Sequence, residues 1–491
     1  MKNTKTITVI DILSWMLFIY ALISYYLTSQ YIASEQLLKL FVCAFVYVGV
    51  RMSMAIIPRT WIKYVSLLIP LAGGYEAIVG ILQGLEIISS NNQNFMITGT
   101  FLNPGPYSIA IVGALCYCIA CFERKEQTKW VKYLCIACCI LCALVLPATQ
   151  SRTAFVALGA CCLIIYRKRL KLRNILIIAL IAVAAGTMLY YFKKESADGR
   201  VFIWLISLKA VFSSKWLSGY GLGGFRPTYA TFAEEYFSNH PDTHFLSVAS
   251  CPEYSFNDYI QIGVELGIIG IILAVSLAVT AIKALIKNNT AIGYSALAVL
   301  ICSLFSYPFN LLQFQVFATF CLAIGAVYCQ KEQKHGIATN AILSIVAVIS
   351  ILLSVKSNNS RSSLLDDHYY FSMGQHLNSE HLYNESNQYL LKGLMMSDDP
   401  MFYNVMGRNY QSLGAYKLAE ESYFKAFGIL PNRIYPLKLL MDLYKETKET
   451  DKLINIATKI INFKPKIVSD YTDEVQKEAQ QILDTNIHTY E

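Results

Sequence analysis

Long apolar runs, separated by short polar segments, recur along the first 355 residues of this 491-residue chain. Most of them have roughly the 17–25 residues that an α-helix needs to cross a hydrocarbon core of about 30 Å. They predict eleven membrane-spanning helices, at residues 9–27, 37–57, 64–84, 105–122, 131–148, 154–166, 174–192, 259–281, 291–307, 316–329 and 337–355. The predicted fold class is therefore all-α, a polytopic bundle of membrane helices.

Composition and charge agree with this class. Hydrophobic residues make up 55% of the chain and charged residues only 15%, against about a quarter in soluble domains. Lysine and arginine gather in every second connecting segment, around residues 59–63, 124–132, 167–173, 283–287 and 331–334. By the positive-inside rule these segments face the cytoplasm, so we expect the N-terminus inside and the 193–258 loop and C-terminal tail outside. The net charge of +8 is thus a topology signal, and no nucleic-acid partner is expected.

The 193–258 loop is the long polar interruption among these apolar runs, and we expect function to lie there. Four apolar residues at helical spacing predict a helix over residues 201–216: Phe202, Leu205, Leu208 and Phe212. Such a helix would either lie in the membrane surface or form a cap packed on the bundle. A glycine cluster follows at 219–224, and Asn257-Asp258-Tyr259 stands at the start of the next apolar helix.

The fourteen cysteines do not indicate a disulfide framework, because all of them except Cys251 fall inside predicted helices. A thiol in that setting behaves as a small apolar group. Cys135-x-x-Cys138 has the spelling of a metal-binding pair, but it lies mid-helix with no neighbouring His or Asp. Cys251 is alone in the outer loop, so no bridge within that loop is expected.

After Val355 the chain becomes polar and rich in tyrosine, and a period of 34 residues appears. From Pro400, residues fall on the small and large positions of a tetratricopeptide repeat: Tyr403, Gly407, Tyr410, Gly414, Tyr416, Ala419, Tyr423, Ala426 and Pro431. A weaker unit precedes this one and a fair one follows it; the alternative is an ordinary helical-hairpin domain. We expect the domain, residues 356–491, to serve as a docking surface for a protein partner over 367–467 or as a brace for the loop.

Four short motifs occur in order, on the side of the membrane that the charge pattern makes the outer one. They read Gly99-Thr-Phe-Leu-Asn103-Pro104, Gln150-Ser151-Arg152-Thr153, Gly199-Arg200-Val-Phe-Ile-Trp204 and Asn257-Asp-Tyr-Ile-Gln-Ile-Gly-Val-Glu265-Leu-Gly267. In this combination the chain resembles the O-antigen ligase superfamily, which includes lipopolysaccharide O-antigen ligases, O-antigen polymerases and bacterial protein O-oligosaccharyltransferases. The resemblance covers about residues 95–275 of a predicted transmembrane domain 1–355. It implies site-shaping roles for Asn103, Trp204 and Asn257.

The resemblance also implies an activity. Enzymes of this superfamily move an oligosaccharide or polysaccharide from a polyprenyl-pyrophosphate carrier to a hydroxyl group on the periplasmic side of the bacterial inner membrane. That hydroxyl would belong to the lipid A core, to a protein Ser or Thr, or to a growing glycan. No metal and no cofactor are expected, so the charge of the departing pyrophosphate falls to arginines, whose planar guanidinium groups bind such oxygens in pairs. The candidates are Arg152, Arg200 and, further into the loop, Arg226.

Structural roles would also explain these charged residues. Arg152 would otherwise extend to the membrane surface, and Arg200 would otherwise stack on Trp204, four residues further along a helix. Glu76, an isolated charge in the third predicted helix, would line a cavity or pair with Arg51.

Several residues are candidates for the proton acceptor. In the ligase branch a histidine commonly precedes the asparagine of the fourth motif and is the proposed base, whereas this chain has Phe256, which accepts no proton. Glu253 is the first candidate, because it shares a helical face with Phe256 if the next helix extends outward. Asp258 is the second, its alternative being a carboxylate that caps the helix. His240 and His244, in a turn-like stretch, are the others.

Two further functions remain open. One is a polymerase that joins one polyprenyl-linked glycan to another, and the other is a non-enzymatic transporter or scaffold. Transporters typically contain inverted repeats with broken helices, and the two halves of this sequence have no visible symmetry. The exterior repeats weigh toward a protein acceptor or partner.

Overall fold

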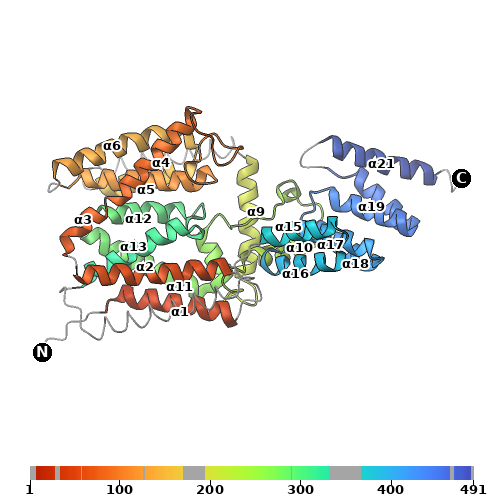
Figure 1. The fold of residues 1–491 in the computed structure, drawn as a ribbon, viewed down its shortest axis with the longest axis horizontal. Coiled ribbons are helices and arrows are strands. Elements are labelled where there is room, and N and C mark those ends of the chain that lie inside the picture. The colour runs from red at the N-terminus through yellow and green to blue at the C-terminus, as the bar shows by residue number, and fades with distance from the viewer. Residues whose placement is uncertain are drawn as a thin grey trace. The chain divides into compact units, whose positions relative to one another are not determined.

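The computed structural model describes residues 7–27, 34–56, 58–124, 128–167, 169, 194–288, 290–330, 367–464 and 469–487. All regular structure in these ranges is helical, which confirms the all-α fold class (Figure 1). The chain divides into two compact units. Unit 1 comprises Met1–Ile23, Gln36–Lys193 and Tyr254–Asn359, and unit 2 comprises Ser24–Glu35, Lys194–Glu253 and Ser360–Glu491.

Unit 1 is the apolar helix bundle. Its helices are α1 (Val9–Leu27, whose last turn is grouped with unit 2), α2 (Ser34–Ile56), α3 (Ile62–Val65), α4 (Leu68–Gly84), α5 (Pro104–Phe122), α6 (Lys129–Val145), α7 (Arg152–Tyr166), α11 (Asp258–Lys287), α12 (Ala291–Cys302) and α13 (Leu312–Cys329). Within the described residues seven helical stretches are long and apolar enough to cross a membrane, and α7 and α12 are shorter apolar helices. They match nine of the predicted spans. The other two, 174–192 and 337–355, lie outside the described residues.

Helix α5 is the centre of this bundle and contacts α4, α6, α7 and α12. Small side chains let the helices approach closely: a Cβ placed on Gly73 of α4 would lie 2.1 Å from the Cβ of Ala114. Close packing of this kind holds helices together where water supplies no hydrophobic driving force between them. Cys116 and Cys142 are buried in the same core, and all fourteen cysteines, each within the described ranges, are free thiols.

A buried ion pair joins α1 to α2. Arg51 is 1% exposed, and its guanidinium donates to both carboxylate oxygens of Asp11 at 2.9 and 3.0 Å. The Tyr47 hydroxyl donates to the same carboxylate at 2.7 Å. The charge of Arg51 is therefore satisfied within its own helix pair, and the expected alternative of a pair with Glu76 is wrong.

Helix α11 is interrupted at Gly267, whose φ of 65° and ψ of −167° are not helical. That backbone conformation is open almost only to glycine. The break takes backbone carbonyls out of the helix ladder, and in a hydrocarbon environment they need another donor. Tyr20 of α1 supplies one, since its hydroxyl donates to the carbonyl of Leu266 at 2.9 Å. Gly267 closes the fourth motif, so this motif runs from the start of α11 to its break.

Unit 2 combines the polar loop with the C-terminal helices. It contains α9 (Lys194–Val211), α10 (Phe225–Asn239), the 3-10 helix η3 (His244–Val248), α15 (Asp367–Ser379), α16 (Tyr383–Ser397), α17 (Pro400–Ser412), α18 (Tyr416–Ile429), α19 (Tyr435–Thr447), α20 (Thr450–Ile461) and α21 (Asp470–Ile487). The C-terminal helices pack in consecutive pairs, α15 with α16, α17 with α18 and α19 with α20. The pairs recur at intervals close to the predicted period.

The first two pairs share one packing device. A Cβ on Gly374 of α15 would lie 2.5 Å from Leu390, and a Cβ on Gly407 of α17 would lie 2.2 Å from Tyr423. In each pair a glycine on the first helix therefore accepts a large side chain from the second. This arrangement suits a repeated helical hairpin, while the assignment to the tetratricopeptide class stays a prediction.

Helix α9 begins and ends earlier than the sequence predicted, at Lys194 and Val211 instead of Val201 and Trp216. Its buried side includes Phe202, whose ring lies 5.1 to 5.4 Å from those of Tyr236, Phe237 and Phe245. Leu208 and Phe212, expected on the same apolar face, are exposed. The helix is thus anchored on α10 and η3 within unit 2, and only part of the predicted apolar face serves that packing.

The C-terminal helices hold the loop at three points inside unit 2. Arg226 at the start of α10 pairs with Asp367 at the start of α15, at 2.7 Å. Lys425 of α18 pairs with Glu234 of α10. The Nδ2 of a buried Asn432 donates to the carbonyl of Ala249 at 2.9 Å. These contacts are what a brace for the loop requires.

Candidate functional site

The first motif forms a tightly held turn before α5. Asn103 caps the helix, its Oδ1 accepting from the Gly105 N–H at 2.9 Å. Gly99 has φ +60, and a Cβ there would lie 2.4 Å from Glu76 Oε2. Gln83 of α4 clamps the turn: its Oε1 accepts from the Gly99 N–H at 2.8 Å and its Nε2 donates to the Gly99 carbonyl at 2.9 Å. The sequence analysis did not assign this role to Gln83, although an amide side chain inside an apolar run was a visible signal.

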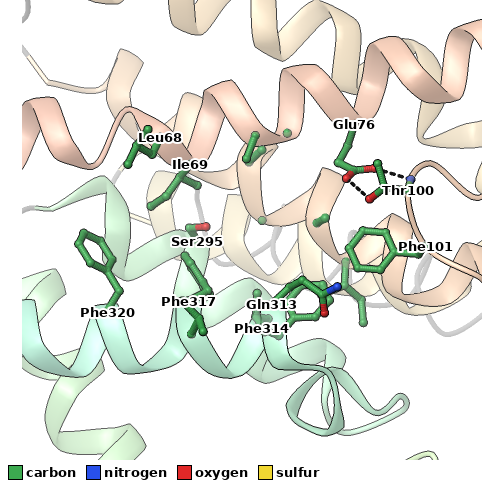
Figure 2. Close-up of a pocket in the computed structure, with 18 of the residues that line it drawn as sticks. Leu68, Ile69, Glu76, Thr100, Phe101, Ser295, Gln313, Phe314, Phe317 and Phe320 are labelled. Atoms are coloured by element: carbon green, nitrogen blue, oxygen red, sulfur yellow. Dashed lines mark hydrogen bonds between the residues drawn. The ribbon is translucent and has the colours of Figure 1, made fainter. Parts of the chain in front are cut away.

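Glu76 lines a pocket of about 500 Å³ in unit 1, bounded by α2, α4, α5, α12 and α13. Its carboxylate accepts from the Thr100 N–H at 3.0 Å and from the Thr100 hydroxyl at 2.5 Å. Figure 2 shows this pair at one end of the pocket and Leu68 and Phe320 at the other. The cavity-lining interpretation of Glu76 is confirmed. The pocket is polar at the motif end and apolar along the rest of its length.

The second motif turns sharply into α7. Gln150 takes the left-handed conformation, with φ 49°, and Ser151 is the cap residue of the helix. Arg152 is the first residue of α7 and is half-buried. A non-glycine residue in this region of the backbone is strained, and such strain concentrates at functional sites.

The fourth motif begins α11 with two polar side chains that have structural partners. Asn257 caps the helix, its Oδ1 accepting from the N–H groups of Tyr259 and Ile260 at 3.0 and 3.1 Å. Asp258 is 2% exposed. Its Oδ2 accepts from the Phe309 N–H at 3.0 Å and its Oδ1 from Asn310 Nδ2 at 2.9 Å. Both oxygens of this candidate base are therefore engaged inside the protein.

Buried amides extend this network into the membrane bundle. Gln261 Nε2 donates to Asn310 Oδ1 at 2.7 Å and to Glu265 Oε1 at 3.1 Å. Asn310 belongs to the connection between α12 and α13, and Gln261 and Glu265 to α11. The network fixes that connection to the first turns of α11. Neither amide was singled out from the sequence.

Phe256, at the position of the family histidine, also lies in the left-handed region, with φ 54°. Its ring meets that of Tyr307 edge-on at 5.4 Å, while Tyr254 stacks on the same tyrosine at 4.4 Å. Because α11 begins only at Asp258, the helix does not extend outward, and the shared helical face expected for Glu253 and Phe256 is wrong. Glu253 is an exposed residue in a non-helical segment.

The segment from Cys302 to Phe314, called here the α12–α13 connector, touches all three motifs of unit 1. Its Cys302 thiol donates to the Thr153 carbonyl at 3.8 Å. Its Ser303 carbonyl accepts from the Asp258 N–H at 3.0 Å. Phe314 stacks on Phe101 of the first motif with ring centroids 5.8 Å apart. Motifs that lie more than 150 residues apart in the sequence therefore meet around one connector.

The remaining candidates belong to unit 2. Arg200 and Trp204 lie on α9, both half-buried. The guanidinium of Arg226 is paired with Asp367 at 2.7 Å. His240 stacks on Tyr236, and its Nδ1–H donates to the Tyr236 carbonyl at 3.0 Å. His244 packs against Phe245. The structure thus groups these residues with the C-terminal helices, and groups Asn103, Arg152, Asn257 and Asp258 with the bundle.

The stretch that contains the second, third and fourth motifs matches a known family. Residues 137–275 match the family model described as O-antigen ligase. The chain contains an O-antigen ligase domain. The matched stretch includes Arg152, the whole polar loop and the start of α11, and it confirms the resemblance that the motifs predicted. It indicates a membrane glycosyltransferase of the O-antigen ligase or polymerase type. No curated protein matches this chain.

Proposed function

We propose that this O-antigen ligase domain transfers a glycan from a polyprenyl-pyrophosphate carrier to a hydroxyl acceptor, on the outer face of a bacterial inner membrane. The observation that carries the proposal is the meeting of three superfamily motifs around the α12–α13 connector, within and beside the family match. A purely structural bundle has no need to gather these segments. The positive-inside pattern supports the outer face.

The pocket beside Glu76 suits the lipid part of such a donor. A polyprenyl pyrophosphate is apolar along its chain and polar at one end, and the pocket has the same division (Figure 2). Phe317 and Phe320 line its apolar part and Thr100 its polar end. We infer that an isoprenoid chain occupies it with the pyrophosphate toward the first motif.

Two arginines are proposed to bind the pyrophosphate. Arg152 stands at the first position of α7, where the N–H groups of the first helical turn and the helix dipole also favour an anion. Arg200 carries the same guanidinium fork on α9. Arg226, the third candidate, pairs with the carboxylate of Asp367 at 2.7 Å, so we place it after the other two. Two guanidinium groups stabilise the charge that develops on the leaving group, and the reaction then needs no metal.

The acceptor hydroxyl must lose a proton as the new bond to the sugar forms. Glu253 is the proposed base, since it is exposed and outside the helix, whereas Asp258 is buried with both oxygens occupied. His240 and His244 are exposed alternatives. Phe256 keeps an aromatic packing role against Tyr307, so Phe256→His alone is not expected to raise the rate.

Transfer to a protein or lipid acceptor is favoured over polymerisation, because the C-terminal helices brace the loop and form a further pocket together with it. The test is a reconstituted reaction. The purified protein in vesicles would receive a polyprenyl-pyrophosphate glycan with one of three acceptors: a lipid A core, a Ser-containing protein, or a second lipid-linked glycan.

We expect free polyprenyl pyrophosphate and one glycosylated product. Products longer than one donor glycan, formed without an added acceptor, would assign the chain to polymerisation. Binding of the donor without release of polyprenyl pyrophosphate under any condition would contradict a transferase.

A further inference from the structure

A second pocket lies wholly within unit 2 and has no part in the chemistry above. It measures about 470 Å³, within the range of roughly 300–1,000 Å³ typical of ligand sites. Its walls come from α15, α17, α18 and α19 and from the segment Ala249–Cys251 of the loop. The pocket therefore sits where the C-terminal helices meet the segment that leads to Glu253.

Two guanidinium groups line this pocket, those of Arg408 on α17 and Arg433 before α19. Neither has an ion-pair partner among the described residues. The Nε of Arg408 is buried and makes no hydrogen bond within the described part of the chain, and the same holds for Oδ1 of the neighbouring Asn404. Buried polar atoms without partners are rare in folded proteins, so each calls for a ligand or a reason.

Asp399, an acidic residue that lines the pocket, and its neighbour Asp398 accept hydrogen bonds from their own part of the chain. Asp399 caps α17, its Oδ1 accepting from the Met401 N–H at 2.8 Å. Asp398 accepts from the Tyr403 hydroxyl. Burial raises the pKa of the Cys251 thiol to about 12, so this side chain stays neutral. The two arginines are thus left to face an anion from outside the chain.

The rest of the pocket lining indicates which kind of anion would bind. Most of it is aliphatic or aromatic: Phe371, Met401, Val405, Leu430, Tyr435 and Pro436. Aliphatic walls of this kind suit apolar side chains, and a peptide offers such side chains next to carboxylates. Planar guanidinium groups bind carboxylates in pairs of hydrogen bonds.

We propose that this pocket binds an acidic peptide segment of a partner protein, with a carboxylate held by Arg408 and Arg433 and a neighbouring apolar side chain packed on Phe371 and Val405. The bound peptide lies against the loop segment that Asn432 fixes through the Ala249 carbonyl. A partner held there is adjacent to the chain that continues to Glu253. Resting on the proposed function, this makes the pocket a means of selecting a protein acceptor.

The test is direct binding to the purified full-length protein, measured by fluorescence anisotropy. The probe is a labelled octapeptide with alternating Asp and Leu at its centre, and its control carries Asn in place of each Asp. We expect the Asp peptide to bind at least about tenfold more tightly, with an affinity that falls as ionic strength rises. Arg408→Gln and Arg433→Gln should each weaken it at least about tenfold. Lys417→Gln removes an exposed charge on α18 away from the pocket and should leave binding unchanged.

Thermal unfolding of each variant shows whether the fold is kept, and Arg408→Lys, which retains the charge but not the fork, should give an intermediate loss. Equal binding of the Asp and Asn peptides would overturn the proposal, as would full affinity in both Gln variants. Tighter binding of a labelled oligogalacturonate would assign the pocket to acidic glycans instead. Because no donor is present, this result is independent of whether the chain transfers glycans.

Discussion

Substitution of Asp258 tests whether its carboxylate has a structural or a catalytic role. Its two oxygens accept from the Phe309 N–H at 3.0 Å and from Asn310 Nδ2 at 2.9 Å, and the side chain is 2% exposed. Asparagine keeps one acceptor oxygen, so one of the two donors loses its partner. A buried donor without a partner costs about 1–3 kcal/mol, so Asp258→Asn should lower the free energy of unfolding by about that amount. Asp258→Ala strands both donors and should cost about 2–6 kcal/mol.

The assay combines thermal unfolding in detergent with glycan transfer measured below the melting temperature of every variant. Asp258→Asn should melt at a lower temperature and still transfer glycan while folded. Glu253→Gln should melt like the wild type and lose roughly 10²–10⁴ in rate, the usual value of a general base. Asp451→Asn, an exposed carboxylate on α20, should change stability by less than about 0.5 kcal/mol and leave transfer intact. If Asp258→Asn melts like the wild type but has no activity, Asp258 is the base and the anchoring argument fails.

Three more predictions concern topology, the helix break and the family position. A cysteine introduced in 225–250 should react with an impermeant reagent in intact cells, whereas one in 167–173 should react only after permeabilisation; the reverse pattern would invert the predicted orientation. Gly267→Ala should lower the free energy of unfolding by about 1–3 kcal/mol, because alanine does not tolerate this backbone conformation. Gly49→Ala, with open space around the new Cβ, should be neutral or stabilising in the same unfolding assay. Phe256→His should leave the transfer rate no higher than that of the wild type, and a clear increase would mean that the loop can use a base at that position.

Local patterns were enough to predict most of the helices. Apolar runs of membrane length are set by neighbouring residues, so α1 begins and ends where the sequence placed it. The end of α9 was misplaced because Phe212 continues the apolar spacing although the helix has already ended at Val211. The spacing of apolar residues does not show where a helix ends when its last residues are exposed.

The contacts that organise the candidate site were not predictable in the same way. Asp258 pairs with Asn310, and Arg226 pairs with Asp367, across separations that no local pattern records. The α12–α13 connector carries no charged side chain that would mark it in the sequence, although it contacts three motifs. A buried amide such as Gln261 in an apolar run was the available signal. Such a residue needs a polar partner, but its sequence position does not say which one.

We propose that guanidinium groups on α7 and α9 bind the departing pyrophosphate. The most direct measurement is the rate of polyprenyl-pyrophosphate release by reconstituted Arg152→Lys and Arg200→Lys proteins, compared with Arg169→Lys beyond the opposite end of α7. Lysine keeps the charge and loses the paired hydrogen bonds, so we expect a fall of one to several decades for the first two variants and none for the third. Near-normal release by both Arg152→Lys and Arg200→Lys would show that neither guanidinium group holds the departing pyrophosphate.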